Sequence, residues 1–260
     1  MEPTILALVG AVGGAGTTRL SLELAGTLAR EGRSVAVVDA AYGTQGLAMA
    51  VPGALDPDIT RVVTEDAPLA DALVDLDITA NLDAATLDVS GSVAVAPARA
   101  PFERLARAKT SQCAQRLAER LSRATEHFDT VIVDVPPVAA NQSIAAVTAA
   151  DRVALVVPAS QRGADALAPA RDRLRDIDTS VDAVVANRVA AGREDSPPVV
   201  ESADVAIPAG EERALAAAPV SHAASTAFAA GVAEATAHLT GVEVDRTFED
   251  EGLLESYFPE

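Results

Sequence analysis

The sequence has almost no lysine, because Lys109 is the only one among 20 basic residues, which face 38 acidic residues. The formal net charge is −18. A charge this negative opposes non-specific attraction to DNA phosphates and to anionic lipid, although molar salt screens most of that field. Direct DNA binding and direct membrane attachment are therefore disfavoured.

Cysteine and long apolar runs are also scarce. Cys113 is the only cysteine, so it can form neither an internal disulfide nor a zinc pattern, and we interpret it as a small residue on a helix face. No apolar run approaches the ~20 residues that span a bilayer. Glu2 and Pro3 open the chain without the basic region of a secretory signal. We expect a soluble, cytoplasmic protein whose scarcity of lysine and surplus of acid resemble those of halophilic proteins.

Apolar β-branched runs alternate with stretches rich in Ala, Leu and Arg, the pattern of βαβ units around a parallel sheet. The predicted strands are residues 5–9, 34–39, 92–96, 130–134, 152–157, 181–186 and 204–207. The predicted helices are residues 18–29, 111–126, 143–149, 163–176, 211–216 and 223–239. With 49% hydrophobic residues, the chain can bury one sizeable α/β core with helices on both faces of a mostly parallel sheet. Residues 190–202 are predicted to form a surface loop.

A glycine-rich turn follows the first predicted strand and leads into the first predicted helix. This context suits a phosphate-binding loop, because backbone N–H groups and a helix N-terminus together cradle an anion. In the usual pattern G-x-x-x-x-G-K-[ST], the lysine reaches the phosphates and the hydroxyl binds Mg²⁺. Here Ala11 opens the pattern, Thr17 occupies the lysine position and Thr18 keeps the hydroxyl. The residues expected to contact phosphate are Gly13, Gly14, Ala15, Gly16, Thr17, Thr18 and Arg19.

Further motifs fall at the ends of predicted strands, where an open α/β sheet places its ligand crevice. Asp39 ends the second strand and Asp134 the fourth, so both carboxylates are expected beside the loop as metal ligands. A later strand ends in Asn187, and the next one leads into Pro208; both are expected in the pocket for a base. Each has a plainer alternative, since glycines also shape ordinary turns and strand-end carboxylates also cap backbone N–H groups.

These motifs, in this order, resemble the MinD/ParA group of deviant-Walker P-loop ATPases, whose loop reads K-G-G-x-G-K-[ST]. The resemblance extends from Gly13–Thr18 through Asp39, the D-x-P-P sequence at Asp134 and the N-R pair at Asn187 to the I-P turn at Pro208. It implies the three-layer P-loop NTPase fold, with ATP or ADP and Mg²⁺ as ligands. It also implies that Thr18, Asp39 and Asp134 hold the metal, that Asp39 takes part in hydrolysis, and that Asn187 and the backbone around Pro208 contact adenine.

The departures from the family pattern concern hydrolysis. Val12 stands where the group has its signature lysine, which reaches across a dimer, and Thr17 stands where the phosphate lysine acts. The D-x-D sequence after the second strand reads Asp39-Ala40-Ala41, so the carboxylate that positions the attacking water is missing. One positioned cation is worth roughly 10³ to 10⁵ in phosphoryl-transfer rate, so these losses should cripple turnover, whereas binding through the backbone is less sensitive.

The resemblance therefore implies a nucleotide-binding protein with impaired or absent ATP hydrolysis that acts as an interaction partner in intracellular positioning, division or partition. The alternative is a slow but genuine ATPase with ATP-dependent dimerisation, in which Arg19 or a partner chain supplies the missing cation. The expected partner is a protein, either a second copy or an active paralogue that lends its lysine.

Two segments are expected in the chain, a P-loop domain over residues 1–240 and an acidic tail over residues 241–260. The tail holds Phe248, Tyr257 and Phe258 among several acidic residues, with only Arg246 nearby. Basic amphipathic helices bind anionic lipid, so an acidic tail disfavours membrane attachment. The tail is either disordered, as termini often are, or a docking peptide, or a segment that packs back on its own domain.

Overall fold

The computed structural model describes residues 4–53, 55–79, 89–190, 198–212, 214–223 and 226–244. Its strands are β1 (Thr4–Gly10), β2 (Ser34–Asp39), β3 (Val74–Asp75), β4 (Ser92–Ala96), β5 (Thr130–Val135), β6 (Arg152–Pro158), β7 (Ala183–Val189) and β8 (Val205–Pro208). Its α-helices are α1 (Thr17–Arg30), α2 (Ile59–Glu65), α3 (Phe102–Ala108), α4 (Ser111–Ala124), α5 (Asn141–Thr148), α6 (Gln161–Arg175), α7 (Pro198–Glu201) and α8 (Ala227–Thr240). Three short 3₁₀ turns are Leu47–Met49, Leu69–Ala72 and Leu215–Ala217.

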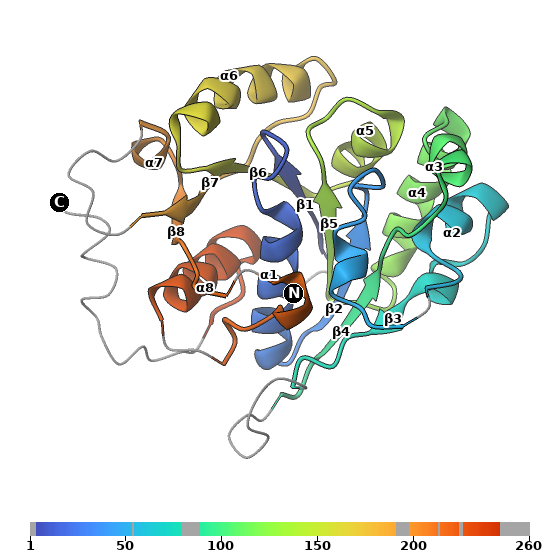
Figure 1. Ribbon diagram of the computed structural model, residues 1–260, viewed down its shortest axis with the longest axis horizontal. Coiled ribbons are helices and arrows are strands. Elements are labelled where there is room, and N and C mark those ends of the chain that lie inside the picture. The colour runs from blue at the N-terminus through green and yellow to red at the C-terminus, as the bar shows by residue number, and fades with distance from the viewer. Residues whose placement is uncertain are drawn as a thin grey trace.

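The strands form one eight-stranded sheet in the order β3-β4-β2-β5-β1-β6-β7-β8. Among the described strands, β3 runs antiparallel to β4, and the other pairings are parallel (Figure 1). β5 lies between β1 and β2, so the carboxyl ends of these three strands meet at one edge of the sheet. In a parallel sheet this edge holds the ligand, and the loop after β1 lies there.

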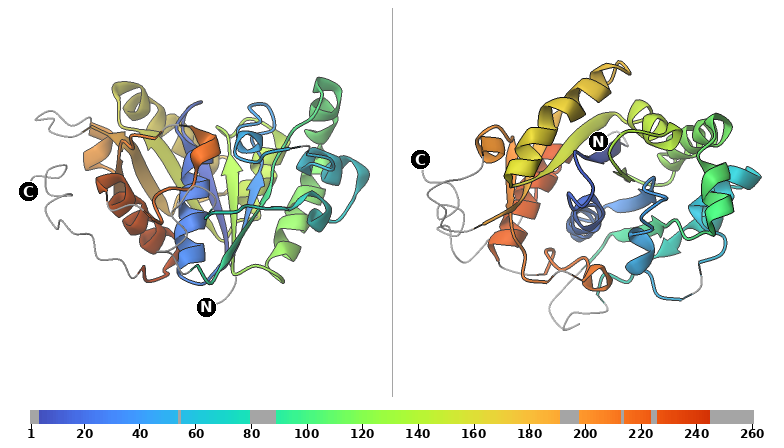
Figure 2. Two further views of the ribbon diagram at one scale, coloured as in Figure 1. Left: turned by 60° about the horizontal axis from the view of Figure 1, so that its bottom comes forward. Right: turned by 45° about the horizontal axis from the view of Figure 1, so that its top comes forward.

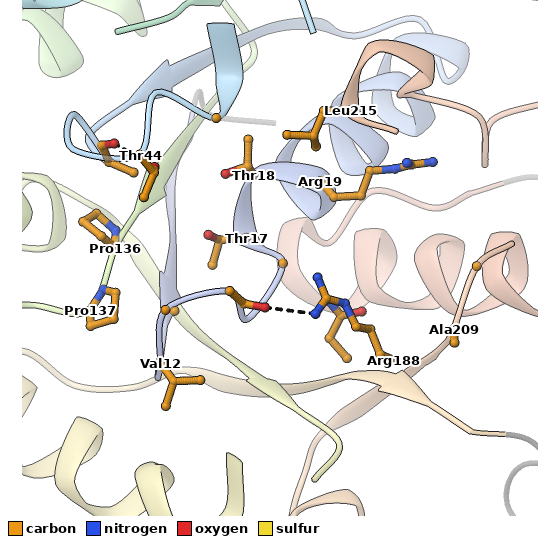
Figure 3. Close-up of a pocket in the computed structure, with 18 of the residues that line it drawn as sticks. Val12, Thr17, Thr18, Arg19, Thr44, Pro136, Pro137, Arg188, Ala209 and Leu215 are labelled. Carbon is orange, nitrogen blue, oxygen red and sulfur yellow. Dashed lines mark hydrogen bonds between the residues drawn. The ribbon is translucent and has the colours of Figure 1, made fainter. Parts of the chain in front are cut away.

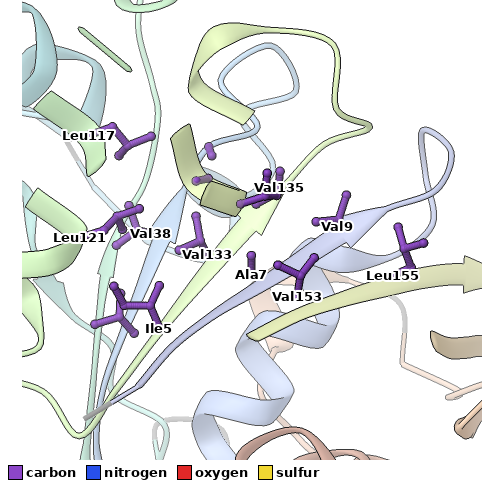
Figure 4. Packing of buried hydrophobic residues seen from close by; sticks show 14 of the residues in the cluster. Ile5, Ala7, Val9, Val38, Leu117, Leu121, Val133, Val135, Val153 and Leu155 are labelled. Atoms are coloured by element: carbon purple, nitrogen blue, oxygen red, sulfur yellow. The ribbon is translucent and has the colours of Figure 1, made fainter. Parts of the chain in front are cut away.

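The core has two layers because successive side chains of a buried strand point to opposite faces of the sheet. Ile5, Ala7 and Val9 of β1 pack with the side of the sheet covered by α2, α4, α5 and α6 (Figure 4). Leu6 and Leu8 pack with α1 and α8 on the other side. The views in Figure 2 show the two helical layers with the sheet between them. The expected three-layer fold is confirmed, and no helix within the described residues is long and apolar enough to cross a membrane.

The predicted strands all form, most of them within a residue of the expected ends. Strand β7 is the exception, because it begins at Ala183 and continues to Val189. The predicted helices over 18–29, 111–126, 143–149 and 163–176 are also present. Cys113 lies buried on α4 as expected.

The prediction of a helix over residues 211–216 is wrong. Among its described residues, the segment forms the start of the 3₁₀ turn Leu215–Ala217. Glu23 of α1 accepts hydrogen bonds from the backbone N–H groups of Val220 (2.9 Å) and Ser221 (2.8 Å), and this long-range contact holds the chain after the turn against α1. Helix α8 begins at Ala227 rather than 223, since the Thr226 side chain caps it by accepting from the Ala229 N–H.

The surface loop predicted over 190–202 is wrong for its last part, where α7 buries Val199 and Val200; residues 191–197 lie outside the described residues. Helices α2 and α3 were not predicted. Asp58 caps α2 by accepting from the Arg61 N–H at 3.1 Å, a signal that its sequence carries. Gly241 ends α8 in the left-handed conformation, and the tail beyond residue 244 lies outside the described residues.

Candidate functional site

The loop from Gly10 to Thr18 connects β1 to α1 and has the backbone of an anion cradle. Gly14 and Gly16 adopt positive φ values of 80° and 96°, which L side chains rarely tolerate. The Ala11 N–H donates to the Val156 carbonyl, which ties the start of the loop to β6. Gly16 precedes the first turn of α1 without a side-chain cap, so the unpaired N–H groups of that turn are available to an anion.

The end of β7 holds this loop in place. The Asn187 side chain donates from Nδ2 to the Ala15 carbonyl at 2.9 Å. Arg188 donates from Nη1 to the Gly14 carbonyl at 3.0 Å (Figure 3). Arg188 itself has a left-handed backbone with φ 63°. A Cβ on Gly16 would collide with Asn187 Nδ2, so the loop and β7 fit only with glycine at this position.

The first turn of α1 places two hydroxyls in front of the cradle. The Thr18 hydroxyl donates to Oδ2 of Asp134 at 2.5 Å, which joins the loop to the end of β5. Thr17 stands in the lysine position, and Figure 3 shows its hydroxyl on the same side as that of Thr18. Val12 points to the opposite side of the loop and packs on the core. At the sequence position where the usual loop has a lysine, this chain therefore has the hydroxyl of Thr17 and no ammonium group.

Asp39 and Asp134 are neighbours in adjacent strands and both are fully buried. Asp39 accepts from the Ala41 N–H at 2.7 Å and from the Ala98 N–H at 3.1 Å. Burial, and then the charge of Asp134, raise the pKa of Asp39 to about 8. Burial also raises the pKa of Asp134, while the hydroxyls of Thr18 and Thr17 oppose that rise. Within the described residues neither carboxylate forms an ion pair, so both are poorly stabilised as anions, and a bound Mg²⁺ would relieve this.

Asp134→Asn should stabilise the nucleotide-free protein at pH 8 by about 1–2 kcal/mol, or roughly 2–8 °C in Tm. Folding raises the pKa of Asp39 from 3.8 to about 8, so the folded state holds more protons than the unfolded one across that window. The free energy of unfolding therefore falls as pH rises through it. Removing the charge of Asp134 should flatten this fall, which thermal melts of both proteins at pH 5 and pH 8 would reveal. A lower Tm of the variant at pH 8 would contradict this description.

The expected metal ligands fit a Mg²⁺ ion in chemistry and place. Mg²⁺ prefers a few carboxylate and hydroxyl oxygens together with water and phosphate oxygens. Thr18 faces the cavity, Asp134 lies directly behind it, and Oδ1 of Asp134 is buried without a hydrogen-bond partner in the described part of the chain. Thr18 and Asp134 would hold the ion, and the negative charge of Asp39, buried beside Asp134, would attract it. The ion would supply charge neutralisation for the phosphates.

A cavity of about 680 Å³ extends from the loop toward β8 and α8. Among the expected contact residues it is lined by Gly13, Gly14, Gly16, Thr17, Thr18, Arg19 and Asn187. Ala15 is buried beneath the loop. Pro208 is also buried, against Gly231 of α8, and the cavity is instead lined by Ala209 and Gly210 after it. The far end is lined by Leu215 and Phe228 together with Glu212, and its two apolar side chains suit the face of a flat base.

Arg19 points away from the loop. Its Nε bonds Glu23 at 2.5 Å, its Nη1 donates to the Ala214 carbonyl at 3.1 Å, and its guanidinium lies 5.9 Å from the centre of the Phe228 ring. Glu23 is fully buried and also holds the segment at Val220. Arg19 and Glu23 thereby position the wall of the base end of the cavity. In this arrangement Arg19 does not face the phosphate end.

Sequence reasoning missed two of these roles. The sequence indicates Arg188 only as part of the N-R pair, whereas in the structure Arg188 lines the cavity and fixes the Gly14 carbonyl. Glu23 lies within the helix predicted over residues 18–29, and nothing in the sequence singles it out; its burial becomes visible only once the segment at Val220 folds over it. An acidic residue four positions after Arg19 was the only local signal for this pair.

The model of the AAA_31 family, described as an AAA domain, matches residues 3–185. The chain belongs to this family. Sequence comparison with curated proteins gives no significant match. The family and the fold together confirm the resemblance to the MinD/ParA group of P-loop ATPases that the motifs indicated.

Solved structures with the same fold differ in their described roles. The MinC:MinD cell division protein complex of Aquifex aeolicus superposes with a TM-score of 0.73 at 18% identity, covering 94% of this chain and 98% of that one. A Cyanothece McdA variant in complex with ATP gives 0.73 at 20% identity, covering 95% and 99%. Cobyrinic acid a,c-diamide synthase from Mycobacterium smegmatis, with an ATP analogue and magnesium, gives 0.68 at 18% identity, covering 95% and 100%. At these identities the likeness shows the fold, and function has to be argued from the site.

Proposed function

We propose that this chain binds ATP or ADP with Mg²⁺, hydrolyses ATP poorly or not at all, and acts by binding a protein partner in intracellular positioning, division or partition. The observation that carries the proposal is the combination of an intact backbone cradle with Thr17 in the lysine position. The Thr18–Asp134 contact of 2.5 Å, beside the cradle, supports metal binding.

The arguments for binding and against turnover come from different residues. Binding relies on loop N–H groups, the α1 dipole and Mg²⁺, and the positive-φ glycines of the loop preserve these elements. Turnover needs cations on the transferring phosphate and a group that positions water. Val12, Thr17 and Ala41 provide neither, and Ala41 contributes only its backbone N–H to Asp39.

The role as a partner rests on analogy with the relatives. MinD of Aquifex aeolicus is seen with MinC, and McdA with ATP. By this analogy we propose a nucleotide-responsive protein that pairs with a second copy or with an active paralogue. The synthase with the same fold marks the limit of the analogy, because its described activity is of another class.

A single-turnover assay with radiolabelled ATP, together with light scattering in the same buffer, separates the proposal from the slow-ATPase alternative. We expect ATP to remain bound and uncleaved over an hour. We also expect the molar mass of the protein in solution to change when ATP or a partner is added. Multiple turnovers coupled to a monomer–dimer cycle would establish the alternative instead. In that case a partner chain has to supply the missing cation, because Arg19 is paired with Glu23.

A further inference from the structure

The cavity has two ends, one on each side of the first turn of α1. Figure 3 shows Leu215 on one side of Thr18 and Thr44 on the other, and all three line the cavity. Leu215 belongs to the end that suits a base, and Thr18 is an expected Mg²⁺ ligand. Because Mg²⁺ bridges the last two phosphates of ATP, a nucleotide bound in this direction has its terminal phosphate toward Thr44.

The loop after β2 borders this terminal-phosphate end. Thr44 belongs to it, and an added Cβ on Gly46 would lie 3.2 Å from Oγ1 of Thr18. Gly43, one residue before Thr44, is exposed and has no side chain. The nearest atom to a Cβ built on Gly43 is Nζ of Lys109, at 3.8 Å. The one lysine of the chain therefore has its ammonium group beside the loop that borders the terminal phosphate.

The main chain of Lys109 is fixed, and its side chain remains free to reach a ligand. The Lys109 carbonyl accepts from Nδ2 of Asn141 at 2.9 Å, and its N–H donates to the Ala106 carbonyl at 3.3 Å. Within the described residues, Lys109 forms no ion pair with a carboxylate. The side chain is half-buried, so it starts from a defined place at the rim of the cavity.

The two arginines that line the cavity are less available to phosphate than Lys109. Arg19 pairs with the buried Glu23, and Arg188 bonds the Gly14 carbonyl. Lysine also differs from arginine in kind, because it carries a compact charge on a flexible four-carbon stem and binds phosphate as a point charge.

We propose that Lys109 reaches across Gly43 to the terminal phosphate of ATP and lets the protein distinguish ATP from ADP. ADP lacks the phosphate that Lys109 reaches, so its binding gains nothing from this contact. This inference rests on the proposed function, because a nucleotide has to occupy the cavity.

The contact replaces part of what the phosphate loop has lost. The usual loop lysine would stand at Thr17, whereas Lys109 approaches from the far side of the terminal phosphate. Ala41 still provides no carboxylate for the attacking water. Lys109 should therefore strengthen ATP binding without restoring turnover.

Because the chain has one lysine, its ammonium group can be observed directly by NMR in the full chain. Reductive methylation with isotope-labelled formaldehyde keeps the charge and labels Lys109 and the terminal amine. The Lys109→Arg variant lacks the Lys109 signal and thereby assigns it. We expect the Lys109 signal to shift on addition of Mg²⁺·ATP and to stay in place with Mg²⁺·ADP.

Calorimetric titration of Lys109→Gln, at one potassium chloride concentration, measures the contact in a second way. We expect roughly tenfold weaker ATP binding than in the wild type and ADP affinity within about twofold. Arg107→Gln is the matched control, because Arg107 is exposed near the end of α3, two positions before Lys109. It should leave both affinities unchanged. Thermal melts verify that each variant is folded.

If the wild type binds ATP but Lys109→Gln binds it equally well, the inference is overturned and the proposed function stands. The same holds if the Lys109 signal ignores ATP or responds equally to ADP. Equal losses in Lys109→Gln and Arg107→Gln would also overturn it, since any nearby cation would then suffice. If the wild type binds neither nucleotide, the proposed function fails and this inference with it.

Discussion

Replacing Thr17 with lysine should tighten Mg²⁺·ATP binding by roughly 10- to 100-fold. A charge-assisted hydrogen bond to phosphate contributes about 1.5–3 kcal/mol, and each 1.4 kcal/mol is about a tenfold change in affinity. The Thr17 side chain already starts on the cavity side of α1, so a lysine there has a direct path to the phosphates. Calorimetric titration of both proteins would measure the gain.

Hydrolysis should stay low in this variant. Thr17→Lys restores neither the lysine at Val12 nor the carboxylate at Ala41, and both concern the reaction rather than binding. The matched control is Thr44→Lys, which places the same charge elsewhere on the cavity lining. An equal gain in both variants would mean that any added cation attracts ATP. No gain in Thr17→Lys would mean that nucleotide does not bind at this loop.

Gly16→Ala should abolish detectable nucleotide binding, a loss of at least about 100-fold, and destabilise the fold by about 2–3 kcal/mol. Gly16 has φ 96°, and an added Cβ would collide with Asn187 Nδ2. Asn187 cannot move aside freely, because it is buried and bonds the Ala15 carbonyl. The loop would have to shift, and its N–H groups would no longer converge on one anion.

Two neighbouring glycines provide graded controls. Gly14→Ala meets no atom within 4 Å but has φ 80°, so it isolates the backbone strain of about 1–2 kcal/mol. Gly13→Ala meets no atom and has no such φ, so it should behave like the wild type. Adding Asn187→Ala to Gly16→Ala should recover part of the stability by relieving the collision. Thermal melts of the series check the order, and a Gly16→Ala protein as stable as Gly13→Ala would contradict the packing described.

The sheet and the phosphate loop could be predicted because their signals are local. Strands such as Ser34–Asp39 are apolar runs that end at a polar residue, and the glycines before α1 mark the turn directly. The placement of Asp39 beside Asp134 also followed, since the carboxyl ends of parallel strands meet at one edge. The antiparallel strand β3, two residues long, carries no such pattern.

The base end of the cavity could not be predicted in the same way. Its wall depends on Glu23 bonding Val220 and Ser221, which lie 197 and 198 residues away in the chain. The Ala-rich segment before them has helix-forming residues, and this long-range contact overrides that propensity. The direction of Arg19 depends on the same contact, so the sequence left open whether it faces the phosphates.

The most direct test of the account is calorimetric titration of ATP and of ADP, each with Mg²⁺, into the wild-type protein in multimolar potassium chloride. The account predicts micromolar affinity, because the loop N–H groups, the α1 dipole, Thr18 and Asp134 remain in place without the lysine. No detectable binding at millimolar nucleotide would contradict it and would make the loop a purely structural turn between β1 and α1.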